Sequence, residues 1–169
     1  RTEAEEAAKR TTARAALSRI EAALTAGGVL DPALADLKGA GIEVPQALAE
    51  QGQGVPTLDA LRAAFPPAAR GALAASLAES AGGSLWDRTL GFLRTQSGAR
   101  SLTPREGADP DAVLSRAEAA LAASDLGAAI GEIGTLPADG QARMAEWVAL
   151  AKRRIAATSA AAALAAEVK

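Results

Sequence analysis

The residues with the most distinctive chemistry lie between Ser84 and Arg105. This stretch holds one of the two tryptophans and one of the two phenylalanines of a chain that has no tyrosine. On a helix with about 100° per residue, its large apolar side chains share one face, and arginines border that face. Such a face is typical of a helix lying in a membrane interface. The predicted membrane-binding residues are Leu85, Trp86, Arg88, Leu90, Phe92, Leu93, Arg94, Arg100 and Arg105.

The charge of this stretch indicates which surface it would meet. It carries four arginines against the single carboxylate of Asp87, whereas the whole chain has a formal net charge of −2. Anionic membrane lipids are therefore the expected partner. Two other interpretations stay open, because the same pattern describes a helix packed on the chain's own core and a helix bound in the groove of a partner protein.

The residue types on which most enzymes rely are missing. The chain has no histidine and no cysteine, which removes the commonest general base, the commonest nucleophile activator and the usual zinc ligands. The segment 52–54, Gly-Gln-Gly, lacks the third glycine of a dinucleotide-binding loop, and no phosphate-binding Gly-Lys-Ser/Thr occurs. We therefore predict a protein that is not an enzyme and has no cofactor and no metal site.

The overall charge and hydropathy exclude further classes. A pI near 5.3 argues against a nucleic-acid-binding protein, which is usually basic over a whole face. No stretch reaches the roughly 18 to 20 apolar residues of a membrane-spanning helix. Because the chain opens at Arg1 without a methionine, we expect a fragment whose upstream part could hold a membrane anchor or a signal.

The composition predicts an all-α fold. Most of the hydrophobic residues are alanine, the best helix former, and the β-branched and aromatic residues that favour strands are scarce. Caps, glycines and prolines divide the chain into a coiled-coil-like helix over 1–26, a connector of short helices over 27–83, the amphipathic segment with its loop over 84–108, and a helical domain over 109–169. We expect a helical bundle with a long C-terminal helix.

Individual boundaries follow from cap and proline signals. Asp31 before Pro32 and Asp109 before Pro110 each predict an N-cap followed by proline at the first helical position. The pair at 66–67, Pro-Pro, predicts a break between two helices. Trp147 lies within an i, i+3, i+4 apolar stripe and is predicted to be buried. The run at 152–154, Lys-Arg-Arg, is predicted to be a solvated helix face.

A second set of residues predicts self-association. The first helix carries one narrow apolar seam, which fits either the end of a coiled coil or a bundle helix. Beyond Ile155 the last helix has few large apolar residues, so its tail is either frayed or packs its alanines against another helix. Both elements lack large apolar partners, and a second copy could supply them, so we predict a homodimer or larger oligomer. The self-association residues are Leu17, Ile20, Leu24, Leu164 and Val168.

Four segments carry a resemblance to a known family. They are 55–66, with Val-Pro and then Leu-Arg-x-x-Phe; 84–93, with Ser-Leu-Trp; 114–136, with a Ser-Asp-Leu turn; and 145–153, with Glu-Trp-Val. In this order they resemble the C-terminal region of the mitofilin family, the membrane-shaping subunit of the mitochondrial contact site complex, and its alphaproteobacterial relatives. That family usually has Gly-Asp-Leu at the turn and Asp-Trp-Leu in the last segment.

The resemblance implies a function and a location. It implies a scaffold that curves and tethers membranes, with a membrane anchor and a coiled coil upstream. The alanine-, arginine- and glycine-rich composition fits a bacterial member, in which this region would lie on the periplasmic side of the inner membrane and would meet envelope or outer-membrane proteins. The alternative is a tetratricopeptide-like protein-binding adaptor in which residues 85–93 close the chain's own core.

Overall fold

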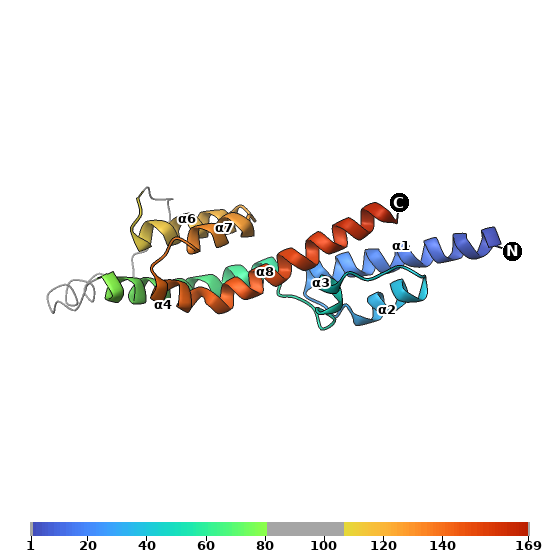
Figure 1. The fold of residues 1–169 in the computed structure, drawn as a ribbon, viewed down its shortest axis with the longest axis horizontal. Coiled ribbons are helices and arrows are strands. Elements are labelled where there is room, and N and C mark those ends of the chain that lie inside the picture. Colours follow the sequence, from blue (N-terminus) through green and yellow to red (C-terminus); the bar gives the residue numbers. More distant parts are fainter. Residues whose placement is uncertain (1, 81–106, 169) are drawn as a thin grey trace. The chain divides into compact units, whose positions relative to one another are not determined.

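The computed structural model describes residues 2–80 and 107–168 (Figure 1). Its regular structure is helical throughout these ranges, and no strand occurs in them. The prediction of an all-α fold is therefore confirmed. In chain order the helices are α1 (Thr2–Ala26), α2 (Asp31–Gly39), α3 (Gln46–Ala49), α4 (Leu58–Ser80), α6 (Pro110–Ala122), α7 (Leu126–Ile133) and α8 (Ala138–Glu167).

The chain forms two compact units, and unit 1 joins distant parts of the sequence. Unit 1 comprises Arg1–Leu58 and Lys152–Lys169, and unit 2 comprises Asp59–Ala151. Helix α8 therefore contributes residues to both units. This division differs from the four consecutive segments expected from the sequence, because the end of α8 belongs with α1.

Helix α1 has the ends that its sequence predicts. Glu3 and Glu5 lie in the first turn, where negative charge interacts favourably with the helix dipole. Gly27 follows the helix with a φ of 74°, a left-handed conformation that glycine adopts at little cost. Residues 2–12 are all exposed, and burial begins at Ala13. The helix is therefore covered only along its second half.

The core of unit 1 joins α1 to the end of α8. Arg14 Nε lies 3.5 Å from the carbonyl oxygen of Val168, and Arg154 Nη1 lies 2.9 Å from that of Leu24, so the two helices run antiparallel. Alanines of both helices are buried, and their small side chains allow a close approach. The core residues are Ala13, Ala16, Leu17, Ile20, Leu24, Leu30, Ala33, Leu34, Leu37, Ala40, Leu48, Val55, Ala157, Ala161 and Leu164.

The basic run at 152–154 is not the uniformly solvated face that we predicted. Lys152 is exposed, but Arg154 is half-buried. Its Nη1 donates to the carbonyls of Leu24 and Pro56, at 2.9 and 3.0 Å. Leu24 belongs to the last turn of α1, whose carbonyls have no donors within the helix. Arg154 therefore supplies a donor for a carbonyl in the last turn of α1. The prediction of a solvated side chain was wrong for this residue.

The predicted N-cap at Asp31 is also wrong. The N-cap position of α2 is Leu30, and no side chain caps the helix. Instead, the backbone N–H groups of Leu30 and Asp31 donate to the carbonyl of Gly52, at 2.7 and 3.0 Å. The Asp31 carboxylate accepts from Nε2 of Gln53 at 2.8 Å. The carbonyl of Gly52 thus accepts the N–H groups at the start of α2. A Cβ at position 52 would lie only 1.8 Å from Oδ1 of Asp31.

Helix α4 continues through Pro66 and Pro67, where a break was predicted. Neither proline has an N–H, so the carbonyls of Arg62 and Ala63 lose their helical donors. Ala63 is exposed and Arg62 is half-buried, so solvent can reach this side of the helix. The opposite side keeps one uninterrupted apolar face, whose burial outweighs the unfavourable prolines. Its buried residues are Leu61, Phe65, Ala69, Ala72 and Ser76.

Within unit 2, α4 meets the first turn of α8 at very short range. A Cβ on Gly140 would lie 2.0 Å from Oγ of Ser76 and 3.3 Å from the carbonyl oxygen of Ala72. Only glycine leaves room for this approach. Oγ of Ser76 is fully buried and has no hydrogen-bond partner in the described part of the chain.

Candidate functional site

All nine predicted membrane-binding residues, Leu85 to Arg105, lie outside the described residues. The structure does describe the chain on both sides of them, up to Ser80 and again from Gly107. Both flanks belong to unit 2. The described residues that precede and follow the amphipathic segment therefore belong to one folded unit, and the contacts of these two flanks can be described.

The flank before the segment is fixed by the last turn of α4. Oε2 of Glu79 accepts a hydrogen bond of 2.9 Å from the backbone N–H of Asp139. Asp139 lies in the first turn of α8, where N–H groups have no partner within the helix and the helix dipole favours negative charge. Glu79 thus caps α8 from another helix and fixes the end of α4 to the start of α8.

The flank after the segment is fixed by Arg116, which forms an ion pair on the α6–α7 hairpin. Nη1 of Arg116 donates to the carbonyl of Gly107 at 2.8 Å, while Nε and Nη2 each lie 2.9 Å from Oε2 of Glu132. The hydrogen bond with Glu132 raises the pKa of Arg116 above its usual value. Asp109 caps α6, as predicted, because its carboxylate accepts from the N–H of Ala112 at 3.1 Å.

The core of unit 2 contains an aromatic pair. Trp147 is 3 % exposed, which confirms that it is a core residue. Its ring meets that of Phe65 edge to face, with the centroids 5.2 Å apart and an interplanar angle of 77°. Its Nε1 donates to the carbonyl of Leu61 at 2.9 Å. The tryptophan therefore binds α4 to α8 by packing and by a directed hydrogen bond.

The turn between α6 and α7 contains a residue in the left-handed region. Ser124 has a φ of 66°, in the region that glycine prefers. Asp125 caps α7, since its carboxylate accepts from the N–H of Ala128 at 2.8 Å. Nη2 of Arg62 donates to Oγ of Ser124 at 3.0 Å and to the carbonyl of Ala122 at 3.1 Å. These bonds to Arg62 compensate for the strained serine.

The proposed self-association residues are found together inside unit 1. Leu17, Ile20, Leu24 and Leu164 are 5 % exposed or less, and Val168 packs against the same core. The buried alanines of α8 settle the question of its tail, which is packed and not frayed. The premise that these residues lack partners within one chain is therefore wrong, because each helix is the partner of the other. Self-association itself stays a prediction.

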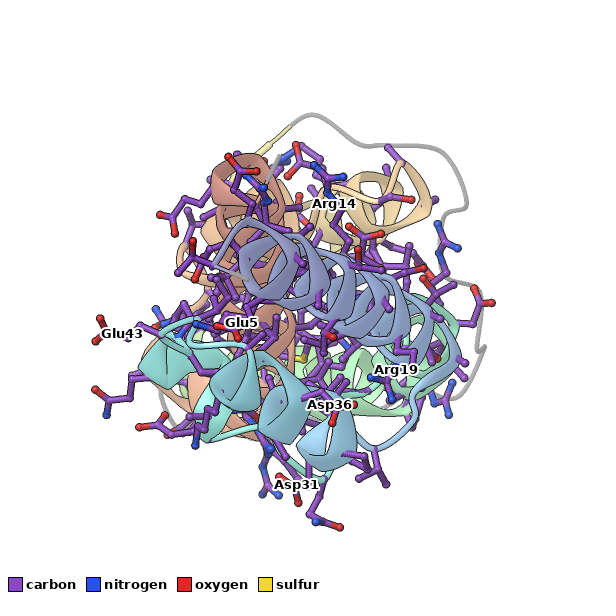
Figure 2. All side chains as sticks on the ribbon, turned by 90° about the vertical axis from the view of Figure 1, so that its right-hand side faces the viewer. Glu5, Arg14, Arg19, Asp31, Asp36 and Glu43 are labelled. Atoms are coloured by element: carbon purple, nitrogen blue, oxygen red, sulfur yellow. The ribbon has the colours of Figure 1, made fainter. Side chains whose placement is uncertain are left out.

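A groove in unit 1 was not foreseen from the sequence. It has a volume of 230 Å³ and runs between the second half of α1 and the last turn of α8. Figure 2 shows Arg14 on the side of α1 away from α2, whereas Arg19 and Asp36 meet where α1 packs on α2. The groove is lined by Arg14, Leu17, Ser18, Glu21, Ala165 and Val168.

Other kinds of site were not found in the parts of the chain that the structure covers. Residues 2–80 and 107–168 contain no cluster of carboxylates that could hold a metal ion. In the same ranges, no helix is both long enough and apolar enough to cross a membrane. Comparison with known protein families, with curated proteins and with solved structures finds no match.

Proposed function

We propose that this chain is a non-enzymatic, self-associating scaffold that binds anionic bilayers through residues 84–105 and helps to form membrane invaginations or contact sites. In a bacterial member of the resembled family it would do so on the periplasmic side of the inner membrane. The proposal rests on the sequence of the segment and on its placement.

The observation that carries the proposal is that the described residues on both sides of the segment belong to one folded unit. Hydrogen bonds of Glu79 and Arg116 fix the two flanks, at the end of α4 and at Gly107. A short amphipathic helix gains affinity for a surface when its ends are already positioned, because less conformational entropy is lost on binding. The glycine-like φ of Ser124 also supports the resemblance, which expects glycine there.

Binding should depend on the arginines of the segment. Each arginine near an anionic surface contributes about 1 kcal/mol. Four arginines and one aspartate give the segment a net charge of +3, which corresponds to about 3 kcal/mol. This is on the order of a hundredfold in affinity. This contribution should fall with salt, whereas the part due to Trp86 and Phe92 should not.

Co-sedimentation with anionic liposomes tests the proposal. Replacing Arg88, Arg94, Arg100 and Arg105 by glutamate should abolish binding without lowering the melting temperature. A matched control replaces four exposed basic residues elsewhere, Arg10, Arg70, Arg143 and Lys152, by glutamate. It makes the same change in net charge and should keep most of the binding. If the wild type does not bind, or if the two quadruple variants lose binding equally, the proposal is wrong.

The alternative function is a helical protein-binding adaptor. The observation that favours it is the α6–α7 hairpin, a pair of packed helices with a tight capped turn. Phe92→Asp separates the two functions. On a lipid-binding helix it weakens liposome binding at every salt concentration and leaves the melting temperature unchanged. In an adaptor whose core contains this segment, it buries a charge and lowers stability by several kcal/mol.

A further inference from the structure

The first half of α1, residues 2–12, extends beyond the core of unit 1. All of these residues are helical, and each of them is exposed. Burial on α1 begins at Ala13, close to the place where Arg14 Nε lies 3.5 Å from the carbonyl oxygen of Val168 at the end of α8. Most helical stability in proteins comes from packing against another element. Because no described element of the chain covers residues 2–12, this half of the helix is where a partner can bind.

The face of this half that points away from the core consists of small side chains. It carries Ala4, Ala7, Ala8 and Thr11, which lie within about 100° of one another on a helix. The buried residues of α1, from Ala13 to Leu24, lie on the opposite side of the helix. Oγ1 of Thr11 donates to the carbonyl of Ala7 at 2.9 Å, so this hydroxyl is already paired. Two such faces can approach closely, but their size alone does not select a partner.

The charges beside this face make it complementary to a second copy of itself. Glu3 and Arg10 are exposed and lie on the same edge of the face, about 10 Å apart along the helix axis. If a second α1 runs antiparallel, with a two-fold axis between Ala7 and Ala8, Glu3 of each copy lies beside Arg10 of the other. A parallel arrangement would instead place Glu3 against Glu3 and Arg10 against Arg10, which is repulsive. The charge order therefore selects the antiparallel orientation.

The remaining charges of this half do not oppose the arrangement. Glu6 and Lys9 lie on the other side of the helix and pair with each other at 3.2 Å. On the second edge of the face, Glu5 of one copy lies beside Thr12 of the other. No like charges are thus brought together within residues 2–12.

We propose that residues 2–12 form a homodimer contact of the chain, in which two copies pack antiparallel about a two-fold axis between Ala7 and Ala8. Such a contact is isologous, because the same surface serves on both copies. The small side chains meet at its centre, and two equivalent pairs of Glu3 with Arg10 lie along its edge. Exposed ion pairs contribute little, and the helices overlap over only about 17 Å. We therefore expect a weak dimer that forms at high micromolar concentration.

The inference rests on the self-association part of the proposed function and names its surface and symmetry. It is tested by light scattering at high micromolar protein in low salt. Arg10→Glu should raise the dimer dissociation constant about tenfold, because it makes two attractive contacts repulsive. Adding Glu3→Arg restores opposite charges across the axis and should return the constant to near the wild-type value. Lys38→Glu is the matched control, since it makes the same charge change at an exposed residue of α2, which packs on the buried side of α1.

A cross-link tests the orientation independently of affinity. The chain has no cysteine, so Ala8→Cys introduces a single thiol beside the axis, and mild oxidation should yield a disulfide-linked dimer. Ala4→Cys is the control on the same face. In an antiparallel pair its two thiols lie about 10 Å apart along the axis, too far for a disulfide, whereas a parallel pair would join them.

Three results would overturn the inference. They are a wild type that stays monomeric, a charge-exchanged double variant as weak as Arg10→Glu, and an Ala4→Cys variant that cross-links as readily as Ala8→Cys. Dimers that fail to bind liposomes would overturn the proposed membrane function instead.

Discussion

The contact between Ser76 and Gly140 in unit 2 allows a strict test of the structure. Replacing glycine by alanine inside a helix normally stabilises by about 1 kcal/mol. At position 140, however, the new Cβ would lie 2.0 Å from Oγ of Ser76 and 3.3 Å from the carbonyl oxygen of Ala72. Forcing an extra methyl group into a packed site costs about 1 to 3 kcal/mol. We therefore expect Gly140→Ala to destabilise by about 1 to 2 kcal/mol.

The partner substitution should have the opposite sign. Oγ of Ser76 is buried without a hydrogen-bond partner among the described residues, and burying an unpaired hydroxyl costs about 1 to 3 kcal/mol. Ser76→Ala removes that atom and should be neutral or stabilise by about 1 kcal/mol. In the double variant the contact of 2.0 Å is gone, and the nearest atoms to the new Cβ are the carbonyl oxygen of Ala72 at 3.3 Å and Cβ of residue 76 at 3.4 Å. The two changes should therefore couple by about 1 to 2 kcal/mol.

Urea unfolding followed by far-ultraviolet circular dichroism measures this cycle. A control is Gly71→Ala, in α4 of the same unit, where a Cβ would meet nothing within 4 Å. That variant should gain about 1 kcal/mol, because only helix propensity changes. If Gly140→Ala stabilises as Gly71→Ala does, or if the double variant shows no coupling, the close approach of α4 and α8 at this point is refuted.

Two further substitutions test the side chains that hold each unit together. Trp147→Ala should destabilise by about 3 to 5 kcal/mol, since it empties a buried aromatic site; an unchanged thermal melting curve would show that Trp147 is exposed. Arg154→Met should cost about 1 to 3 kcal/mol, because it leaves the carbonyls of Leu24 and Pro56 without their donor. Lys152→Met, on the exposed side of α8, should change the melting temperature little, and equal effects of the two methionine variants would contradict the assigned role of Arg154.

A local signal in the sequence correctly predicted the start of α6, where Asp109 is the N-cap. Asp109 and Asp125 each cap a helix through a side-chain oxygen that accepts from the N–H group three residues later, and such contacts need no other part of the chain. Asp31 also precedes a proline, as Asp109 does, but its side chain does not cap the helix that follows. Its helix start is satisfied by Gly52, which lies twenty-one residues away in the sequence. A cap can be predicted only when its partner is local.

The helix break predicted at residues 66–67 was wrong because of contacts made outside the helix. A proline pair normally ends a helix, at a cost of about 3 kcal/mol or more. Here Leu61, Phe65 and Ala69 keep a continuous buried face across the pair. The burial of Phe65 against Trp147 alone recovers an amount of this order. The outcome is decided by tertiary packing, which the helix sequence does not contain.

The candidate sites were predictable to different degrees. The apolar seam of α1 was correctly identified as buried surface, but its partner was assigned to a second copy, because the alanines of α8 looked too small to form a core. In the structure, Ala157 and Ala161 pack directly on that seam. The groove beside α1 was missed, because the sequence does not show that the end of α8 lies along this helix.

The arginines show why a count of basic residues says little about binding in this chain. Arg62 in unit 2 and Arg154 in unit 1 each donate to carbonyls in the last turn of a helix, α6 and α1 respectively. Arg116 pairs with Glu132 and holds Gly107. These cations complete helix ends and turns in a protein that has few large side chains for packing. A membrane role for arginine therefore has to be argued from more than one feature, and residues 84–105 combine four arginines, one tryptophan and one phenylalanine with a single carboxylate.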